Sequence, residues 1–149
     1  MSILILPDDY LMSPDVQNVM GERAMKYLLL RCIEERKFEA MSQKECGAFK
    51  DALAAQCDQL RKDGHLIAAE PLESVEKAVT VRGGDGKVSV TDGPFADTKE
   101  QIGWFFLINA RDLNEAIQVA SKFPSVHLGS MEVRPIMEQH RSSQAPIVA

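Results

Sequence analysis

The sequence predicts an α+β fold in which two helices pack on an antiparallel sheet. Two segments repeat apolar residues at steps of three and four, as amphipathic helices do. Shorter segments between them alternate or are continuously apolar, as strands are, and the order is strand, helix, strand, hairpin, strand, helix, strand. The length of 149 residues suits one domain with a buried core, and a hydrophobic fraction of 45% with 26% charged residues is ordinary for a globular protein.

The first half contains the strongest helix signal. Residues 26–33 are predicted to form a strand with Leu28 and Leu30 on one face. Residues 42–63 are predicted to form a helix, because Ser42 and Glu45 can make a capping box and Gly64 provides a stop. The apolar stripe of this helix is Cys46, Phe49, Leu53, Cys57 and Leu60.

The second half begins with a strand at 65–72, followed by a hairpin of strands 78–82 and 87–91 around Asp85-Gly86. Residues 102–109 are apolar on both faces, which is typical of a central strand. Asp112 and Glu115 repeat the capping pattern before a helix that ends at Phe123-Pro124. The apolar stripe expected for this helix is Leu113, Ala116, Ile117 and Ala120. Residues 129–137 form the last strand, in which Pro135 indicates an edge or a strand end.

Two strand-helix-strand units favour a ferredoxin-like sandwich with an inserted β-hairpin. Two helices cover only one face of such a sheet, and we expect the other face to be apolar through residues such as Leu66, Phe105 or Phe106. A second sheet packed face to face would cover it, so the sequence predicts a homodimer. Residues 1–24 are expected to be an extension, 25–138 the domain and 139–149 a flexible tail.

The composition also limits the classes of partner that we expect. The net charge is −5 and the basic residues are scattered, so we expect neither direct nucleic acid binding nor a membrane surface as partner. No apolar run approaches about 20 residues, the length of a membrane span, and the start lacks a basic leader. Three cysteines without close paired spacing indicate reduced thiols and a cytoplasmic location.

The loop segment DGPFADTKEQIG at 92–103 is the first candidate for a binding site. Gly93-Pro94 forces a turn or extended backbone, which presents Asp92 at the end of a strand with Lys99 close behind. Loops beside a rigid sheet often carry binding residues. The alternative is that Asp92 only accepts backbone hydrogen bonds in a turn.

Four segments carry a resemblance to a known family. They read MKYLLL at 25–30, AAEPL at 68–72, VTDGPFADTKEQIGWFFLINARDLNEAI at 90–117 and GSMEVRPI at 129–136. With these segments, residues 25 to 138 resemble the DGPF-type members of the YCII-related family. The resemblance implies a ferredoxin-like fold, dimers that form an α+β barrel and a cytoplasmic bacterial protein.

The resemblance is less informative about activity. Some YCII-related members are dehydrochlorinase-like enzymes with a proposed His–Asp acid–base pair, and DGPF-type members are associated with extracytoplasmic-function sigma factors. The histidine of that pair belongs near the end of the first strand, where this chain reads CIEERKFEAM and has none. The histidines present are His65, His127 and His140, so the pair does not carry over.

Charged residues on apolar strand faces give a second set of candidates, because such charges are costly unless they are paired. Glu70 is expected to share a face with Leu66, Ala68 and Leu72, and Arg31 a face with Tyr27, Leu29 and Ile33. Glu132 and Arg134 lie two residues apart and point to one side. Structural ion pairing is one interpretation of these residues. The other is a pocket between the sheet and a dimer mate.

Two functional hypotheses follow. The first is a small-molecule enzyme, with Asp92 and Glu70 as acid–base groups and Lys99, Glu132, Arg134 and Arg31 as substrate-binding residues. The second is a non-catalytic dimeric module that binds a ligand or a protein, linked to sigma-factor regulation. No metal-ligand spacing or nucleotide-binding loop is present, so neither a metal nor a cofactor is expected.

Overall fold

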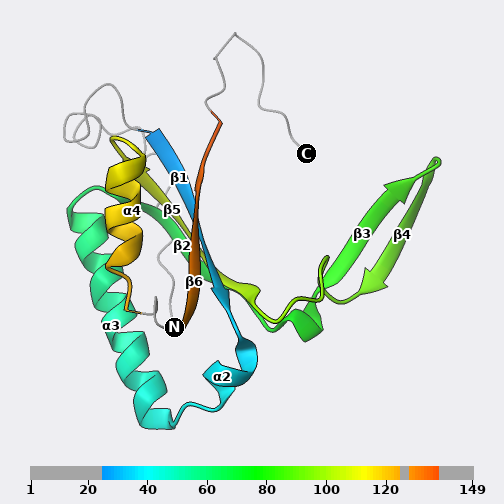
Figure 1. Ribbon diagram of the computed structural model, residues 1–149, viewed down its shortest axis with the longest axis horizontal. Helices are drawn as coiled ribbons and strands as arrows, with labels where there is room; N and C mark the ends of the chain where they lie inside the picture. Colours follow the sequence, from blue (N-terminus) through cyan, green and yellow to red (C-terminus); the bar gives the residue numbers. More distant parts are fainter. Residues whose placement is uncertain (1–24, 125–127, 138–149) are drawn as a thin grey trace.

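The computed structural model describes residues 25–124 and 128–137 (Figure 1). Four antiparallel strands form the central sheet in the order β2-β5-β1-β6. Their bounds are Met25–Ile33 for β1, Leu66–Pro71 for β2, Gln101–Ala110 for β5 and Gly129–Pro135 for β6. The predicted ends 1–24 and 139–149 lie outside the described residues.

Three α-helices accompany the sheet in this part of the chain. They are α2 (Glu35–Glu39), α3 (Gln43–Lys62) and α4 (Leu113–Ser121), and a short 3₁₀ helix, η2, spans Val75–Lys77. With α2, η2 and the hairpin set aside, the order β-α-β-β-α-β is that of the ferredoxin-like motif. The α+β class predicted from the sequence is therefore confirmed.

The long helices begin where their capping residues predict. The Ser42 hydroxyl accepts a hydrogen bond from the Glu45 amide at 3.1 Å, and the Glu45 carboxylate accepts one from the Ser42 amide at 2.8 Å. Helix α3 ends before Gly64, whose φ of 78° is favourable for glycine. Asp112 caps α4 by accepting from the Glu115 amide at 2.9 Å.

The buried stripe of α4 differs from the expected one. Ala116, Val119 and Ala120 are buried, whereas Leu113 and Ile117 are 47% and 46% exposed. The helix thus turns a face rich in small residues toward the sheet. Alanines allow the helix backbone to lie close to the strands, which explains why larger neighbours are displaced from the contact.

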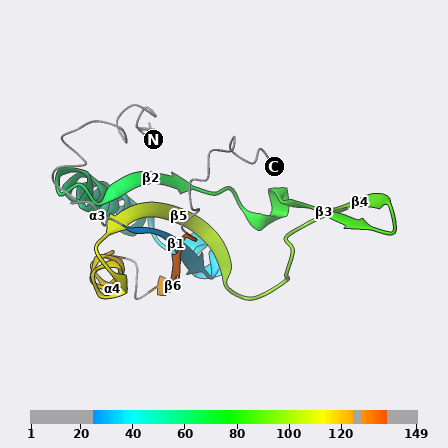
Figure 2. The ribbon, with the colours of Figure 1, turned by 90° about the horizontal axis from the view of Figure 1, so that it is seen from above.

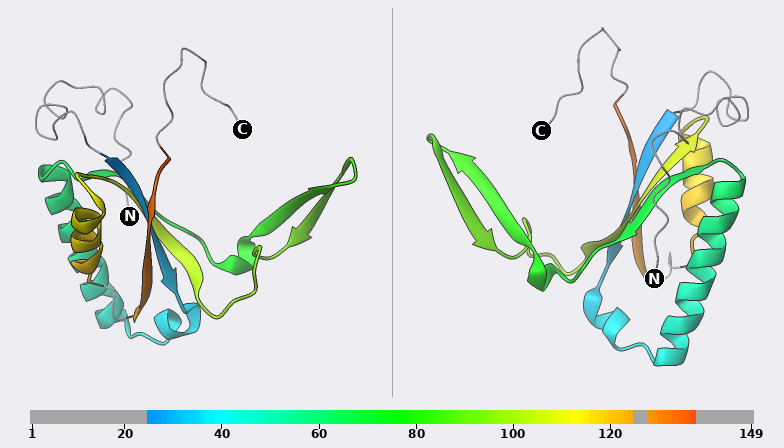
Figure 3. Two further views of the ribbon diagram at one scale, coloured as in Figure 1. Left: turned by 45° about the horizontal axis from the view of Figure 1, so that its top comes forward. Right: turned by 180° about the vertical axis from the view of Figure 1, so that it is seen from behind.

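The core lies between the sheet and helices α3 and α4, which sit on the same side of it (Figures 1 and 3). Alternate residues of β1 and β5 point into this core. The largest fully buried side chains are Tyr27, Leu29, Phe106 and Ile108. The Phe106 ring packs 4.4 Å from that of Phe123, just after α4. We call this the helix side of the sheet.

The opposite face, which we call the open side, carries the other alternate residues. Its central side chains are half-buried and apolar: Leu28, Leu30, Phe105 and Leu107. Among the described residues, no helix covers this face. The expected position of Leu66 and Phe106 on this face is wrong, because both belong to the buried core.

The predicted face of Leu66 is wrong because the pairing of β2 with β5 is irregular. Leu66 pairs with Ile108, but Ala68 already pairs with Leu107. The irregularity at Ile67 places Leu66 on the face opposite Ala68 and Glu70, so the strict alternation assumed from the sequence fails here. For the same reason, Glu70 does not share a face with Leu66.

The hairpin of β3 (Val79–Gly84) and β4 (Lys87–Asp92) extends away from the sheet (Figure 2). Asp85 and Gly86 have φ angles of 49° and 73°, as a tight two-residue hairpin turn requires. The register places four valines on one face of the hairpin, and each is more than half exposed: Val79, Val81, Val88 and Val90.

Candidate functional site

An open pocket of about 540 Å³ lies beside the loop that joins β4 to β5. This loop pocket is bounded by the ends of β1 and β5, by η2 and by the loop itself. Its lining is mostly apolar and includes Leu72, Val75, Ala78, Pro94, Phe95, Ala96 and Ile102, together with Cys32 and Glu100. Pro94 and Phe95 of the DGPF segment line this pocket, whereas the carboxylate of the segment, Asp92, does not.

Local hydrogen bonds fix the shape of the loop. Gly93 has a φ of 101°, and its amide donates to the Ala78 carbonyl at 2.7 Å. The Thr80 hydroxyl donates to the Gly93 carbonyl at 2.8 Å. At the other end, the Gln101 side-chain amide donates to the carbonyls of Ala96 and Thr98 at 2.8 and 2.9 Å. Hydrogen bonds within the chain thus hold the loop at both ends.

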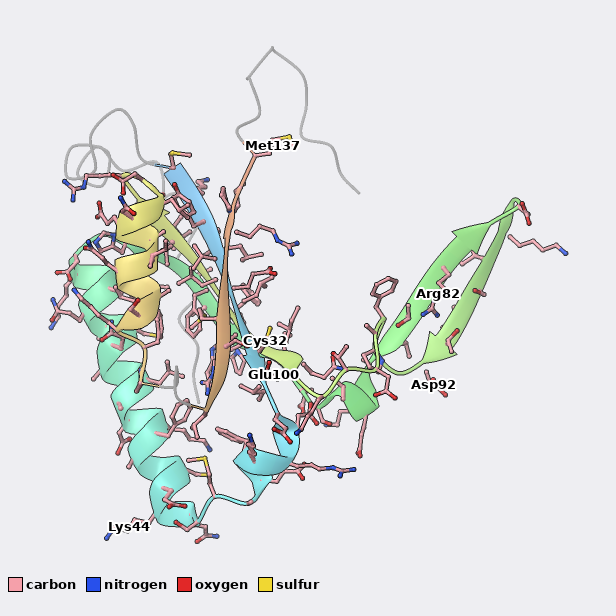
Figure 4. The ribbon with its side chains drawn as sticks, in the orientation of Figure 1. Cys32, Lys44, Arg82, Asp92, Glu100 and Met137 are labelled. Atoms are coloured by element: carbon pink, nitrogen blue, oxygen red, sulfur yellow. The ribbon has the colours of Figure 1, made fainter. Side chains whose placement is uncertain are left out.

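Cys32 and the exposed residue Glu100 both line the loop pocket and lie near each other (Figure 4). The Ser130 hydroxyl lies 3.1 Å from both carboxylate oxygens of Glu100. Burial raises the pKa of the Cys32 thiol, and the negative charges of Glu100 and Glu132 raise it further. The thiol is therefore protonated at neutral pH and is a poor nucleophile.

Neither Asp92 nor Lys99 lines this pocket. Asp92 is the last residue of β4, as predicted, and is exposed at the base of the hairpin, away from Cys32 and Glu100 (Figure 4). The Lys99 ammonium lies 3.6 Å from the Glu34 carboxylate. Hydrogen bonding from Lys37, with a smaller effect of Lys99, lowers the pKa of Glu34.

Glu132 and Arg134 meet at one edge of the open side, where their charged groups lie 2.8 Å apart. Glu70 lies at the other edge. It pairs with Phe105, which pairs with Leu30, which pairs with Glu132. Three strand spacings separate the two glutamates, or roughly 14 Å. The open side is therefore an apolar centre between two charged edges.

Arg31 lies on the helix side of the sheet, whereas the open side carries Glu70, Glu132 and Arg134. It shares that face with Tyr27 and Leu29, as predicted, and is 2% exposed. Within one chain, the structure therefore joins Glu132 with Arg134 and keeps Asp92, Glu70 and Arg31 apart. Whether a second copy brings these groups together stays a prediction.

His65 has a structural environment. One ring nitrogen, Nδ1, lies 2.8 Å from the Asn109 carbonyl oxygen, and the other, Nε2, lies 3.4 Å from the Glu115 carboxylate. The ring thus ties the start of β2 to β5 and α4. His127 and His140 lie outside the described residues.

Sequence reasoning missed the contribution of Cys32 and Glu100 to the loop pocket. The position of Glu100, one residue before β5, was the available signal, because a strand start beside a loop often carries a site residue. In residues 25–124 and 128–137, no group of three or more His, Cys, Asp or Glu side chains is placed to hold a metal ion.

These features define an α+β protein with a pocket at an aromatic loop beside the sheet, and comparison with known proteins gives its family. The family model of the YCII-related domain matches residues 25–140. An uncharacterised protein of Rhizobium meliloti (strain 1021) is 34% identical over 114 residues, which cover 75% of this chain and 92% of that protein. The chain belongs to the YCII-related family. Within the described residues, no helix is both long and apolar enough to cross a membrane.

Proposed function

We propose that the protein is a homodimeric small-molecule-binding protein whose ligand occupies the loop pocket. The observation that carries this proposal is the pocket itself: about 540 Å³ with largely apolar walls, beside a loop that is already held in shape. Ligand sites are typically concave and apolar, with a few polar groups that fix orientation. The charged lining residues are Glu73, Lys77 and Glu100, of which Lys77 and Glu73 pair with each other at 3.1 Å, so Glu100 is the charged group that could do so.

The apolar open side supports the dimer. Its centre consists of Leu28, Leu30, Phe105 and Leu107. Covering apolar surface of this kind with a partner is favourable, because it removes the surface from water. The loop pocket adjoins the same face, because its lining residues Cys32 and Ile102 pair with each other next to this centre. A second sheet packed on the open side would therefore narrow the mouth of the pocket. The ferredoxin-like sandwich and the dimeric α+β barrel belong to this proposal.

A carboxylate acid–base enzyme is the second candidate. The hydrogen-bonded Glu100 carboxylate in the loop pocket favours it, since a positioned carboxylate can act as a general base. Catalysis by Asp92 and Glu70 requires the partner copy, because neither residue lines the loop pocket of its own chain. Ligand binding needs no such pair and is therefore the stronger proposal. A cytoplasmic setting and a link to sigma factors stay predictions from the resemblance.

The test is a titration with the neutral apolar dye N-phenyl-1-naphthylamine, followed by its fluorescence. Ala96→Trp places a large ring in the loop pocket, and we expect it to weaken dye binding by about tenfold or more. Asp97→Trp is the matched control, because Asp97 is the next residue but does not line this pocket. The proposal fails if the wild type binds no dye saturably, or if both variants bind it as the wild type does. Sedimentation of the same samples reports the dimer separately.

A further inference from the structure

Arg31 is a buried cation that does not line the loop pocket. Its side chain is 2% exposed on the helix side of the sheet, and it pairs across the strands with Trp104 and Met131. The guanidinium lies 4.7 Å from the centroid of the Phe49 ring of α3. Burial lowers the pKa of Arg31 to about 10, so the group still carries its charge at neutral pH.

No carboxylate of the described residues compensates this charge. Nε and Nη2 of Arg31 are buried and have no hydrogen-bond partner there. Glu35 is nearby, but its carboxylate is occupied by the Ser74 hydroxyl and the Val75 amide, both at 2.9 Å. A buried charge without a partner destabilises a fold, and an anion that reached it would offset that cost.

A second pocket, of about 200 Å³, opens at this arginine. It lies between α2, the ends of β1 and β2 and the first half of β5. Its apolar walls are Ile33, Phe38, Pro71, Leu72 and Trp104, and Glu35, Glu39 and Ser74 are its other polar lining residues besides Arg31. Cavities of about 150 Å³ are known to hold a benzene molecule, so one ring or a short chain fits this volume.

We propose that this Arg31 pocket binds a small organic monocarboxylate. The carboxylate would take the free guanidinium nitrogens, for which paired oxygens are the matching acceptor. The apolar body would lie against Trp104 and Phe38. One buried cation balances one negative charge, and the carboxylates of Glu35 and Glu39 would repel a dianion such as phosphate. This site is separate from the loop pocket, although Leu72 and Ser74 line both.

Trp104 makes the proposal measurable, because it is the one tryptophan of the chain and it lines this pocket. The full-length protein is titrated with benzoate and with benzamide, a neutral molecule of almost the same shape, at constant ionic strength. We expect benzoate to change the tryptophan fluorescence saturably and to raise Tm. Benzamide should bind about tenfold or more weakly, because it cannot pair with the cation.

Arg31→Met keeps the length of the side chain and removes the charge, so we expect it to abolish the preference for benzoate. Arg134→Met is the control, since Arg134 lies exposed on the open side, and it should bind benzoate as the wild type does. Arg31→Lys keeps a charge without the paired donors and should bind benzoate more weakly than the wild type. Equal response to benzoate and benzamide would overturn the proposal, as would unchanged benzoate binding in Arg31→Met.

If Arg31→Met does not fold, the proposal is still tested by the wild-type comparison of the two ligands and by the Arg31→Lys titration. A wild type that shows no saturable response to millimolar benzoate would mean that the Arg31 pocket does not accept a monocarboxylate. That result would overturn the ligand proposal. Because the dye titration of the loop pocket uses a neutral probe, the two sites can fail independently.

Discussion

The two faces of the central sheet are built from the same strands but are buried to different extents. Phe106 on the helix side is fully buried against Phe123 and stacked on Trp104, whereas its neighbour Phe105 on the open side is only half-buried. Both faces are apolar, but the described helices cover one of them. Apolar residues on the second face stay half-buried within one chain and gain less from burial than those on the helix side. Their presence therefore points to a partner surface rather than to an internal core.

The hairpin repeats this contrast in a smaller element. Its four valines share one face, yet each is exposed by more than half, and the other face carries Thr80, Arg82, Ser89 and Thr91. An isolated two-stranded hairpin is marginally stable in water. A partner that covers the valine face would stabilise it, so the hairpin and the open side make the same prediction.

The largest expected effect is the loss of a ring from the helix side. Phe106→Ala removes a fully buried side chain from contacts with Phe123 and Trp104. We expect a loss of about 3–5 kcal/mol in the free energy of unfolding, because the cavity cannot be filled by solvent. Urea denaturation followed by circular dichroism measures it. A loss below about 1 kcal/mol would mean that the helix side is not the packed core.

Phe105→Ala is the matched variant one residue away. If the open side were free, the change would cost little at any protein concentration. If a second copy covers it, the midpoint of unfolding should depend on protein concentration in the wild type and less so in the variant.

A charge placed at the centre of the open side should have the next largest effect. Leu30→Asp puts a carboxylate between Phe105 and Glu132 in the row across the sheet. We expect dimer dissociation to become at least about a hundredfold more favourable, since the charge would be buried without a partner. Sedimentation equilibrium measures this change. Lys44→Asp is the control, because Lys44 is exposed on helix α3 and away from the open side, so this change should leave the association almost unchanged. A wild type that sediments as a monomer at micromolar concentration would remove the basis for a dimer.

The sequence predicted most of the fold because its signals were local. The capping box of Ser42 and Glu45, the Asp85-Gly86 turn and the apolar run of β5 each specify one element, and each is found. Helix α2 was not predicted, since it has only five residues and no side-chain hydrogen bond at its N-cap. The irregular pairing at Ile67 was not predictable either, because it depends on the partner strand.

The candidate site was harder to predict, because it depends on which face of the sheet the helices cover. Alternation correctly grouped Arg31 with Tyr27 and Leu29, but could not show that this group faces α3 and lies opposite Glu132. The loop was identified by its Gly-Pro turn and its aromatic residue. The contact of Glu100 with Ser130 could not be predicted, because it depends on where β6 pairs with β1.

A smaller effect is expected from the valine face of the hairpin. The double change Val81→Thr and Val90→Thr keeps shape and β-propensity at two cross-strand neighbours. If a partner covers this face, dimer dissociation should become up to about tenfold more favourable, while unfolding of the sheet stays the same. The double change Thr80→Ser and Thr91→Ser, which removes one methyl group from each side chain on the polar face and keeps both hydroxyls, serves as the control. Equal association of both variants and the wild type would show that the valine face is free.

The smallest expected effect concerns a polar contact at the helix side. Glu115 of α4 pairs with Arg111 and also approaches His65, and hydrogen bonding from Arg111 lowers the pKa of the Glu115 carboxyl. A carboxyl whose pKa is lower in the folded state stabilises the fold above its ordinary value near 4.5, and this contribution is lost as the pH falls through the folded pKa. Glu115→Gln should therefore lower Tm slightly at pH 7 and make the decline of Tm below pH 4.5 shallower than in the wild type. Thermal unfolding across that range tests the prediction, with Glu45→Gln as a capping control, because glutamine also completes a capping box. Parallel pH profiles for the wild type and Glu115→Gln would mean that this carboxylate does not hold α4 to the sheet. The helix side would then depend on apolar packing alone, and its difference from the open side would lie entirely in what covers each face.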